Sequence, residues 1–344
     1  MYSETDLNSA VDAGVLTPEA AAAFRNHIAA TRLAPAVDEE SFRLLTGFND
    51  IFVAIAIALL LTAVAWIGGW IADPAGGAAV AVVSWALAEY FTRRRRMALP
   101  SILLLLTFVG GVAAALVGVM TETNPDLPDR LDAVIIAGIA LVTAGAAWLH
   151  WRRFMVPITV AAGGAALVGV VVALFMAATG ARDEAVYPMV LVGGVAMFAV
   201  AMWWDMSDRE RRTRRADVAF WLHLAAAPMI AHSVFHMLGV FDGTIGIGMA
   251  LVVLALYVAF GFVALAVDRR ALLVSSLAYV LYALYALFQK AGAVELSAAF
   301  TALVIGSALL LLSAFWHPAR RLAVSLLGDL AKRLPPVQQA VAAV

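Results

Sequence analysis

The amino-acid sequence predicts an all-α membrane protein, a polytopic bundle of about ten transmembrane helices. Its composition is 64% hydrophobic and 14% charged, with a mean hydropathy of +0.92, whereas soluble domains are about 45–50% apolar and about 25% charged. Many of its apolar segments approach the roughly 20 residues that a helix needs to cross a bilayer. Arginines gather in the short connections between these segments, which indicates a regular topology.

The first region, residues 1–46, is polar and predicts a small cytosolic helical head. Ser3 and Gly14 are suited to begin and end a short helix, and Thr17 with Pro18 is suited to start a second one. We expect a minimal core between the two helices, made by Leu7, Val11, Leu16, Phe24 and Ile28.

The second region, residues 47–316, is predicted to form the transmembrane bundle. The expected spans are 51–71, 75–91, 99–120, 131–151, 154–178, 185–204, 218–238, 247–267, 271–288 and 296–316. The very tight turn at Asp73 and Pro74 leaves two interpretations of residues 51–91, as two spans or as one re-entrant unit.

The basic residues orient this bundle. A charged side chain at the centre of a spanning helix costs roughly 2.5–3.5 kcal/mol, and cytoplasmic loops are enriched in Lys and Arg. If the N-terminus is cytoplasmic, all but three of the 23 basic residues fall on the cytoplasmic side, the exceptions being Arg130, Arg182 and Lys290. The pattern predicts an even number of spans with both termini in the cytoplasm.

A repeated helical hairpin is also indicated. The run from Arg95 to Pro100 resembles the run from Arg152 to Pro157, and a glycine-rich span follows each. We expect at least two, and up to four, hairpins in the same orientation. The alternative for the later units is the spacing that any multi-pass protein with basic cytoplasmic loops would show.

The third region, residues 317–344, differs from the spans. Its leucines share one helical face, while most of its basic residues lie off that face, which is typical of an amphipathic helix lying at the membrane surface. These leucines are Leu322, Leu326, Leu327, Leu330 and Leu334.

Motifs for chemistry are missing from the sequence. The chain has no cysteine, which excludes disulfides, thiol catalysis and cysteine metal sites. No nucleotide loop, zincin motif or nucleophile elbow occurs, so we predict no catalytic residue and no cofactor, and an enzyme is not favoured. The expected partners are the bilayer, anionic lipid headgroups at the basic loops and a second copy of the chain, but not nucleic acid.

The most informative span is 218–238, because ionisable residues inside a membrane are candidates for function. His232 and His236 are four residues apart and share a helix face, whereas His223 points in nearly the opposite direction. Three interpretations stay open for the pair: hydrogen bonds between helices, the lining of a polar cavity, or a metal or proton site. A third metal ligand is expected from Glu184, Asp242 or Glu295 at the same membrane face.

Span 271–288 adds a stripe of tyrosines, which is typical either of helix packing or of a ligand site. If this span is a neighbour of span 218–238, its tyrosines and the histidines line one outward-facing cavity. The predicted cavity residues are His232, Ser233, His236, Tyr279, Tyr282 and Tyr285.

A family resemblance appears in the first hundred residues. The run Gly14-Val15-Leu16-Thr17-Pro18-Glu19, the run from Phe42 to Phe52 and the Trp- and Gly-rich first span are similar to bacterial multi-pass proteins, grouped as a predicted-membrane-protein family of unknown function. The resemblance implies a bacterial cytoplasmic (inner) membrane and a short cytosolic head before many spans. It implies no activity and no catalytic residue.

Two functions follow from these observations. One is transport of a small molecule or lipid, or a channel, through a cavity near the spans 218–238 and 271–288. The other is a non-transporting membrane scaffold or envelope-stress partner that docks through the head and the basic loops.

Overall fold

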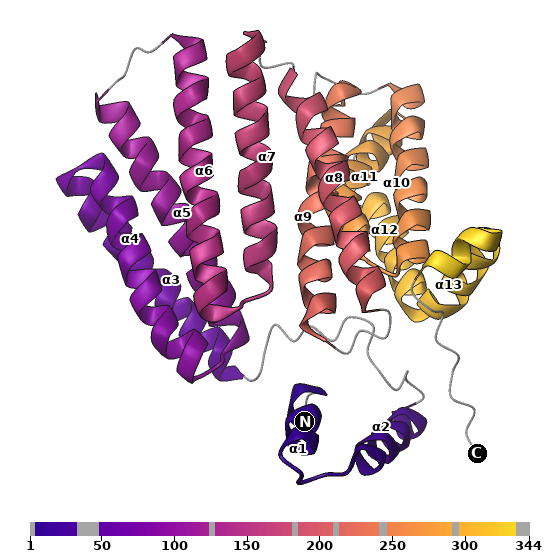
Figure 1. Cartoon of the computed structure of the whole chain (residues 1–344). Helices are drawn as coiled ribbons and strands as arrows, with labels where there is room; N and C mark the ends of the chain where they lie inside the picture. Colours follow the sequence, from indigo (N-terminus) through magenta and orange to yellow (C-terminus); the bar gives the residue numbers. More distant parts are fainter. Residues whose placement is uncertain are drawn as a thin grey trace.

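The protein is all-α, as the sequence predicts. The computed structural model describes residues 4–32, 48–123, 128–180, 185–208, 213–240, 246–290 and 296–334, and these contain thirteen α-helices and no strand. Figure 1 shows a bundle of long helices, with two short helices below it.

The head begins with α1 (Glu4–Asp12) and α2 (Pro18–Arg32). Gly14 follows α1 with φ +70°, and the Oγ1 of Thr17 accepts a hydrogen bond from the Ala20 backbone N–H at 3.2 Å. The predicted end of the first helix and start of the second are thus confirmed. Ser3 lies outside the described residues.

The core of the head is smaller than expected. Among the head side chains that the structure describes, Ala21 is the buried one, at 1% exposure, whereas Phe24 is 41% exposed. The prediction of Phe24 as a core residue is therefore wrong, because two short helices meet only closely enough to cover an alanine. The side chain of Ile28 lies outside the described part. The Arg25 guanidinium donates to the Asn8 side-chain oxygen at 3.0 Å and ties α2 to α1.

Within the described residues, ten helices are long and apolar enough to cross a membrane, which identifies an integral membrane protein. They are α3 (Phe48–Ile71), α4 (Asp73–Ala88, continued by the π-helical stretch η1, Glu89–Arg94), α5 (Ala98–Thr123), α6 (Asp129–Phe154), α7 (Ile158–Thr179), α8 (Val186–Ser207), α9 (Arg214–Met237), α10 (Ile247–Val267), α11 (Ala271–Lys290) and α12 (Ser297–Ala314).

The first hairpin consists of two separate helices. Only Ala72 lies between α3 and α4, and the Asp73 backbone N–H is satisfied by the Glu122 carboxylate at 2.9 Å. Helix α3 is long enough to cross a membrane, and so is the continuous helix formed by α4 and η1. The structure therefore favours two spans over one re-entrant unit.

Helices α4/α5, α6/α7, α8/α9 and α10/α11 pack as antiparallel pairs, with their basic connections at the same end of the bundle (Figure 1). In three of these turns a non-glycine residue adopts a left-handed conformation: Arg96 (φ 52°), Met155 (φ 55°) and Asp268 (φ 63°). The next residue is buried in each case. It is Met97 or Val156 in the first two turns and Arg269 in the third.

Glycines bring α4 and α5 into backbone contact. A Cβ added to Gly77 would lie 2.4 Å from the Ala115 backbone nitrogen, and one added to Gly111 would lie 2.8 Å from the Gly77 carbonyl oxygen. Since small residues let membrane helices approach closely, this contact fits the glycine-rich sequence after the first basic turn.

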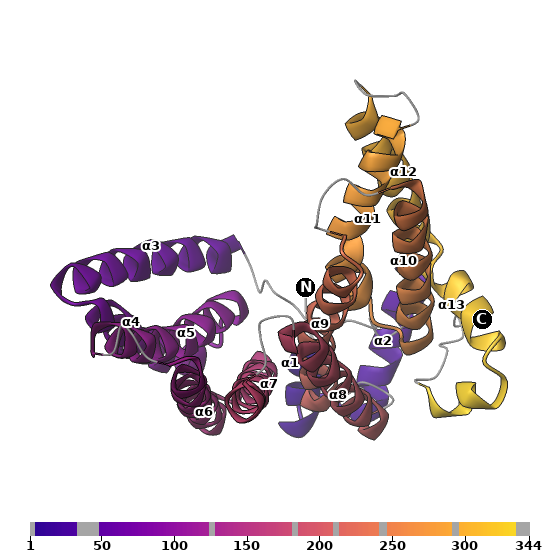
Figure 2. The ribbon, with the colours of Figure 1, turned by 90° about the horizontal axis from the view of Figure 1, so that it is seen from above.

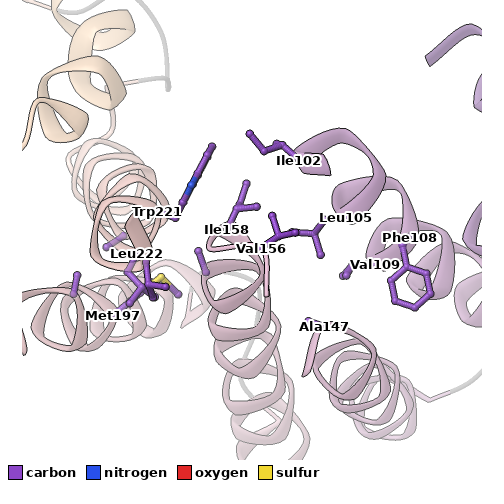
Figure 3. Packing of buried hydrophobic residues seen from close by; sticks show 14 of the residues in the cluster. Ile102, Leu105, Phe108, Val109, Ala147, Val156, Ile158, Met197, Trp221 and Leu222 are labelled. Atoms are coloured by element: carbon purple, nitrogen blue, oxygen red, sulfur yellow. The ribbon is translucent and has the colours of Figure 1, made fainter. Parts of the chain in front are cut away.

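Seen along the helix axes, α3–α7 and α8–α12 form two groups that meet where α7 packs on α8 and α9 (Figure 2). An apolar cluster joins the groups toward the end with the basic turns. In Figure 3, Ile102 of α5 and Ile158 of α7 face Trp221 and Leu222 of α9. Helix α9 is the most enclosed of the long helices. Of its most apolar 18-residue stretch, 56% of the residues are buried, compared with at most 39% in the other spans.

The C-terminal segment is not one amphipathic helix. Helix α13 (Trp316–Ser325) ends before Gly328, which has φ +55°, and a short 3₁₀ helix (Gly328–Arg333) follows. Leu322 is 66% exposed, whereas Arg320 is 1% exposed on the face that packs on the bundle. The carboxylate of Asp268 lies beside this buried arginine, and the membrane-surface position of the exposed leucines stays a prediction.

Candidate functional site on helix α9

The two predicted histidines lie in the half of α9 that is farther from the basic turns. His232 is exposed and comes five residues before the end of the helix at Met237, about 7.5 Å along the axis. Helices α9 and α11 pack against each other, and the His232 Nδ1 shares a hydrogen bond of 2.5 Å with the Tyr279 hydroxyl. Two residues of the predicted cavity are therefore in direct contact.

His236 is held by a residue that the sequence did not point to. Its ring stacks on Tyr187 of α8, with ring centres 3.5 Å apart and planes 14° apart. Tyr187 also lies 5.8 Å from the His232 ring. A tyrosine at the start of a span looks like an ordinary interfacial residue, and only the packing of α8 beside α9 gives it this position. We call His232, His236, Tyr187 and Tyr279 the outer cluster.

The other predicted cavity residues, Ser233, Tyr282 and Tyr285, differ in their burial. Ser233 is fully buried, about 100° around the α9 axis from His232, and its hydroxyl makes no hydrogen bond among the described residues. On α11, Tyr282 is 36% exposed and Tyr285 is 40% exposed. The Tyr285 hydroxyl accepts a hydrogen bond from Gln289 at 2.7 Å.

A metal site with three protein ligands is not formed by the part of the chain that the structure describes, where no group of three His, Asp or Glu residues occurs. The predicted third ligands Glu184, Asp242 and Glu295 lie outside the described residues. The two histidines are neighbours, with ring centres 6.1 Å apart and planes 56° apart.

A second cluster, at the opposite end of α9, was missed by the sequence analysis. Asp205 of α8 accepts two hydrogen bonds from the Arg269 guanidinium, at 2.5 and 3.0 Å, and lies 3.2 Å from the His223 Nε2. Arg269 also donates to the Ala216 carbonyl at 3.3 Å. Asp205, His223 and Arg269 are each at most 2% exposed.

The neighbouring residue of the same turn extends this cluster to α13. The Asp268 carboxylate accepts a hydrogen bond from the Trp316 indole at 2.9 Å and lies 3.4 Å from the Arg320 guanidinium. Arg270 covers the Trp316 ring, with its guanidinium carbon 4.8 Å from the ring centre. We call Asp205, His223, Asp268, Arg269 and Arg320 the inner cluster.

The inner cluster pairs two carboxylates with two guanidinium groups. It therefore buries no net charge when its histidine is neutral, and its ion pairs link α8, α9, the α10–α11 turn and α13. From the sequence alone, its arginines are predicted only to be cytoplasmic charges. The adjacent pair Asp268-Arg269 between two apolar spans was the available signal, but its partners are far away in the sequence.

The basic turns of the other half are more exposed. Glu89 lies 3.4 Å from Arg93 and also accepts two hydrogen bonds from Arg153, at 2.7 and 2.8 Å. Together with the apolar surroundings, this carboxylate helps to hold the α4–α5 and α6–α7 turns side by side. Arg94, Arg95 and Arg96 remain exposed around it.

No protein-family model, curated protein or solved structure matches this chain. The resemblance of the first hundred residues to a bacterial membrane-protein family therefore stays a prediction. What the chain does must be argued from the two clusters on α9.

Proposed function

We propose that this integral membrane protein transports a small polar solute or ion, and that the outer cluster is part of the path. The observation behind the proposal is the exposed His232, which lies inside a long apolar helix with its ring held by Tyr279. In this proposal the basic turns and both termini are cytoplasmic and the outer cluster faces the opposite side, as in the positive-inside rule.

The solvation of the His232 ring supports a water-accessible path. A polar group transferred to an apolar medium without compensating hydrogen bonds costs about 1–3 kcal/mol by mutational measurements. An imidazole exposed about 7.5 Å inside the helix end is stable at lower cost if water or a solute reaches it. Polar residues within membrane spans commonly face such cavities and mark pathways.

The absence of cysteine from the chain makes a clean test available. Single cysteines would be placed by His232→Cys and Tyr282→Cys and exposed to a membrane-impermeant thiol reagent from outside intact cells. Both positions are expected to react. Val258→Cys is the control, because Val258 is 71% exposed on the apolar helix α10 and is expected to face lipid.

Equal, slow labelling at all three positions would contradict the transport path. It would favour the alternative of a scaffold that docks through the head and the basic turns. A scaffold also predicts that deleting residues 1–46 abolishes function while His232→Ala and Tyr282→Ala are tolerated.

The exposed arginines support one further part of the proposal. Arg93–Arg96 and Arg152–Arg153 lie at the ends of spans and are exposed, with Glu89 beside them. In a bacterial cytoplasmic membrane such a basic surface would contact anionic lipid headgroups, at roughly 1 kcal/mol for each basic side chain near the surface.

A further inference from the structure

We infer that His232 and His236 together bind a divalent first-row transition-metal ion, for which Zn²⁺ is the reference probe. The further step, that such an ion is the transported solute, rests on the proposed function. The binding site itself rests only on the geometry of the outer cluster.

The spacing of the two rings suits one metal ion. Histidines four residues apart on a helix present their rings on one face, as in helical zinc motifs. Zn–N bonds are about 2.0–2.1 Å long, so two imidazoles on one ion have ring centres about 5 Å apart in tetrahedral geometry and about 6.4 Å apart when opposite each other. The separation here, 6.1 Å, lies between these values and nearer the opposite arrangement, so a tetrahedral ion would draw the two rings about 1 Å closer together.

Both rings are held in place by neighbouring groups. A metal ion would take the Nε2 of His232, because its Nδ1 is bonded to the Tyr279 hydroxyl. Tyr279 is in turn fixed by stacking on Phe235, with ring centres 4.3 Å apart, and is 8% exposed. Ligating histidines usually make such a second hydrogen bond, which sets the ring orientation. Stacking on Tyr187 orients His236 while leaving its ring edge available.

The ligand set also indicates which ions fit and how firmly. Imidazole suits Zn²⁺, Cu²⁺ and Ni²⁺, whereas Mg²⁺ and Ca²⁺ prefer oxygen ligands. Structural zinc sites are closed by four protein ligands, but here the described chain supplies two histidines near each other and no third His, Asp or Glu. Water would complete the coordination, and an ion held in this way exchanges readily.

The test is a titration of the purified full-length chain, carrying an affinity tag without histidine, with ZnCl₂ and with MgCl₂ in separate calorimetric experiments. Zn²⁺ is expected to bind and Mg²⁺ is not. His232→Ala and His236→Ala should each lower the Zn²⁺ affinity at least tenfold. His27→Ala removes an exposed histidine of the head and should leave the affinity unchanged.

A second pair of variants tests the role of the hydrogen bond. Tyr279→Phe should lower the affinity by 10-fold or more, in line with the roughly 10- to 100-fold effect of outer partners of metal ligands. Tyr285→Phe changes a tyrosine of the same helix that bonds to Gln289 and should have no effect. Wild-type affinity in both histidine variants would overturn the inference.

A spectroscopic measurement keeps the inference testable if a variant fails to fold. The wild-type chain loaded with one equivalent of Cu²⁺ should show, by electron paramagnetic resonance, couplings to two imidazole nitrogens. Signals from only one imidazole, or from none, would contradict the site. Thiol labelling at His232→Cys without metal binding would retain the transport path and remove the metal. Metal binding without thiol labelling from outside would retain the metal site and contradict the transport path.

Discussion

Helix α9 carries a histidine cluster toward each end, and the two clusters are built differently. In the inner cluster, His223 is 1% exposed beside a carboxylate that an arginine also holds. In the outer cluster, His232 is exposed and shares a hydrogen bond with a neutral tyrosine, Tyr279. The two histidines are nine residues apart, about 13.5 Å along one helix.

The difference teaches how a buried charge and a ligand site can be told apart. Burying a charged group costs free energy unless an opposite charge and hydrogen bonds compensate for the lost water. A buried, charge-balanced group of side chains is therefore typical of a contact that holds helices together. The α10–α11 turn supplies both Arg269 and Asp268, so one turn fixes α8 on one side and α13 on the other. The outer rings are fixed in orientation but not enclosed.

The largest expected effect is the loss of Arg269. The substitution Arg269→Ala leaves the Asp205 carboxylate buried without its guanidinium, and breaking such a pair costs about 3–5 kcal/mol. The free energy of unfolding, measured by denaturant titration in detergent, should fall by that amount. The double change Asp205→Leu with Arg269→Met should recover most of it. If Arg269→Ala lowered the free energy of unfolding by less than about 1 kcal/mol, the Asp205–Arg269 pair would not hold these helices together.

A smaller effect is expected at the contact with α13. Trp316→Phe removes the indole donor to Asp268, and a lost hydrogen bond to a charged group is worth about 1.5–3 kcal/mol. Limited proteolysis should then cleave sooner within α13, at the exposed Arg321. Unchanged proteolysis would mean that Asp268 does not anchor this helix.

The outer hydrogen bond should contribute less to stability. Tyr279→Phe removes one neutral hydrogen bond beside an exposed ring, so the free energy of unfolding should fall by about 1 kcal/mol. The same denaturant titration measures it. A loss as large as that for Arg269→Ala would end the distinction between the two clusters.

The loss of stability for His232→Ala is expected to match that for Tyr279→Phe. Both changes break the same neutral hydrogen bond, so the free energy of unfolding should fall by about 1 kcal/mol. Zn²⁺ affinity should nevertheless fall, so this variant separates binding from folding. A strong loss of stability would assign His232 to the core of the protein.

Much of the fold could be predicted because its signals are local. Apolar length and the arginine turns give the ten helices α3–α12, and Gly14 and Thr17 mark the ends of the head helices. The inner cluster could not be predicted, since Asp205 and Arg269 are 64 residues apart and meet only if α8 lies beside the α10–α11 turn.

The outer cluster was predicted in part for the same reason. The spacing of His232 and His236 is visible in the sequence, and Tyr279 was proposed as a neighbour. Tyr187 was not, because it comes from a helix whose contact with α9 no local pattern encodes.

One measurement tests the contrast between the clusters directly. The unmodified full-length chain in membranes would be treated with diethyl pyrocarbonate, which modifies accessible imidazoles, and each histidine would be quantified by mass spectrometry. We predict rapid modification of His232, slowed by Zn²⁺, and protection of His223. Modification of His223 as fast as His232, with no effect of Zn²⁺, would contradict the account.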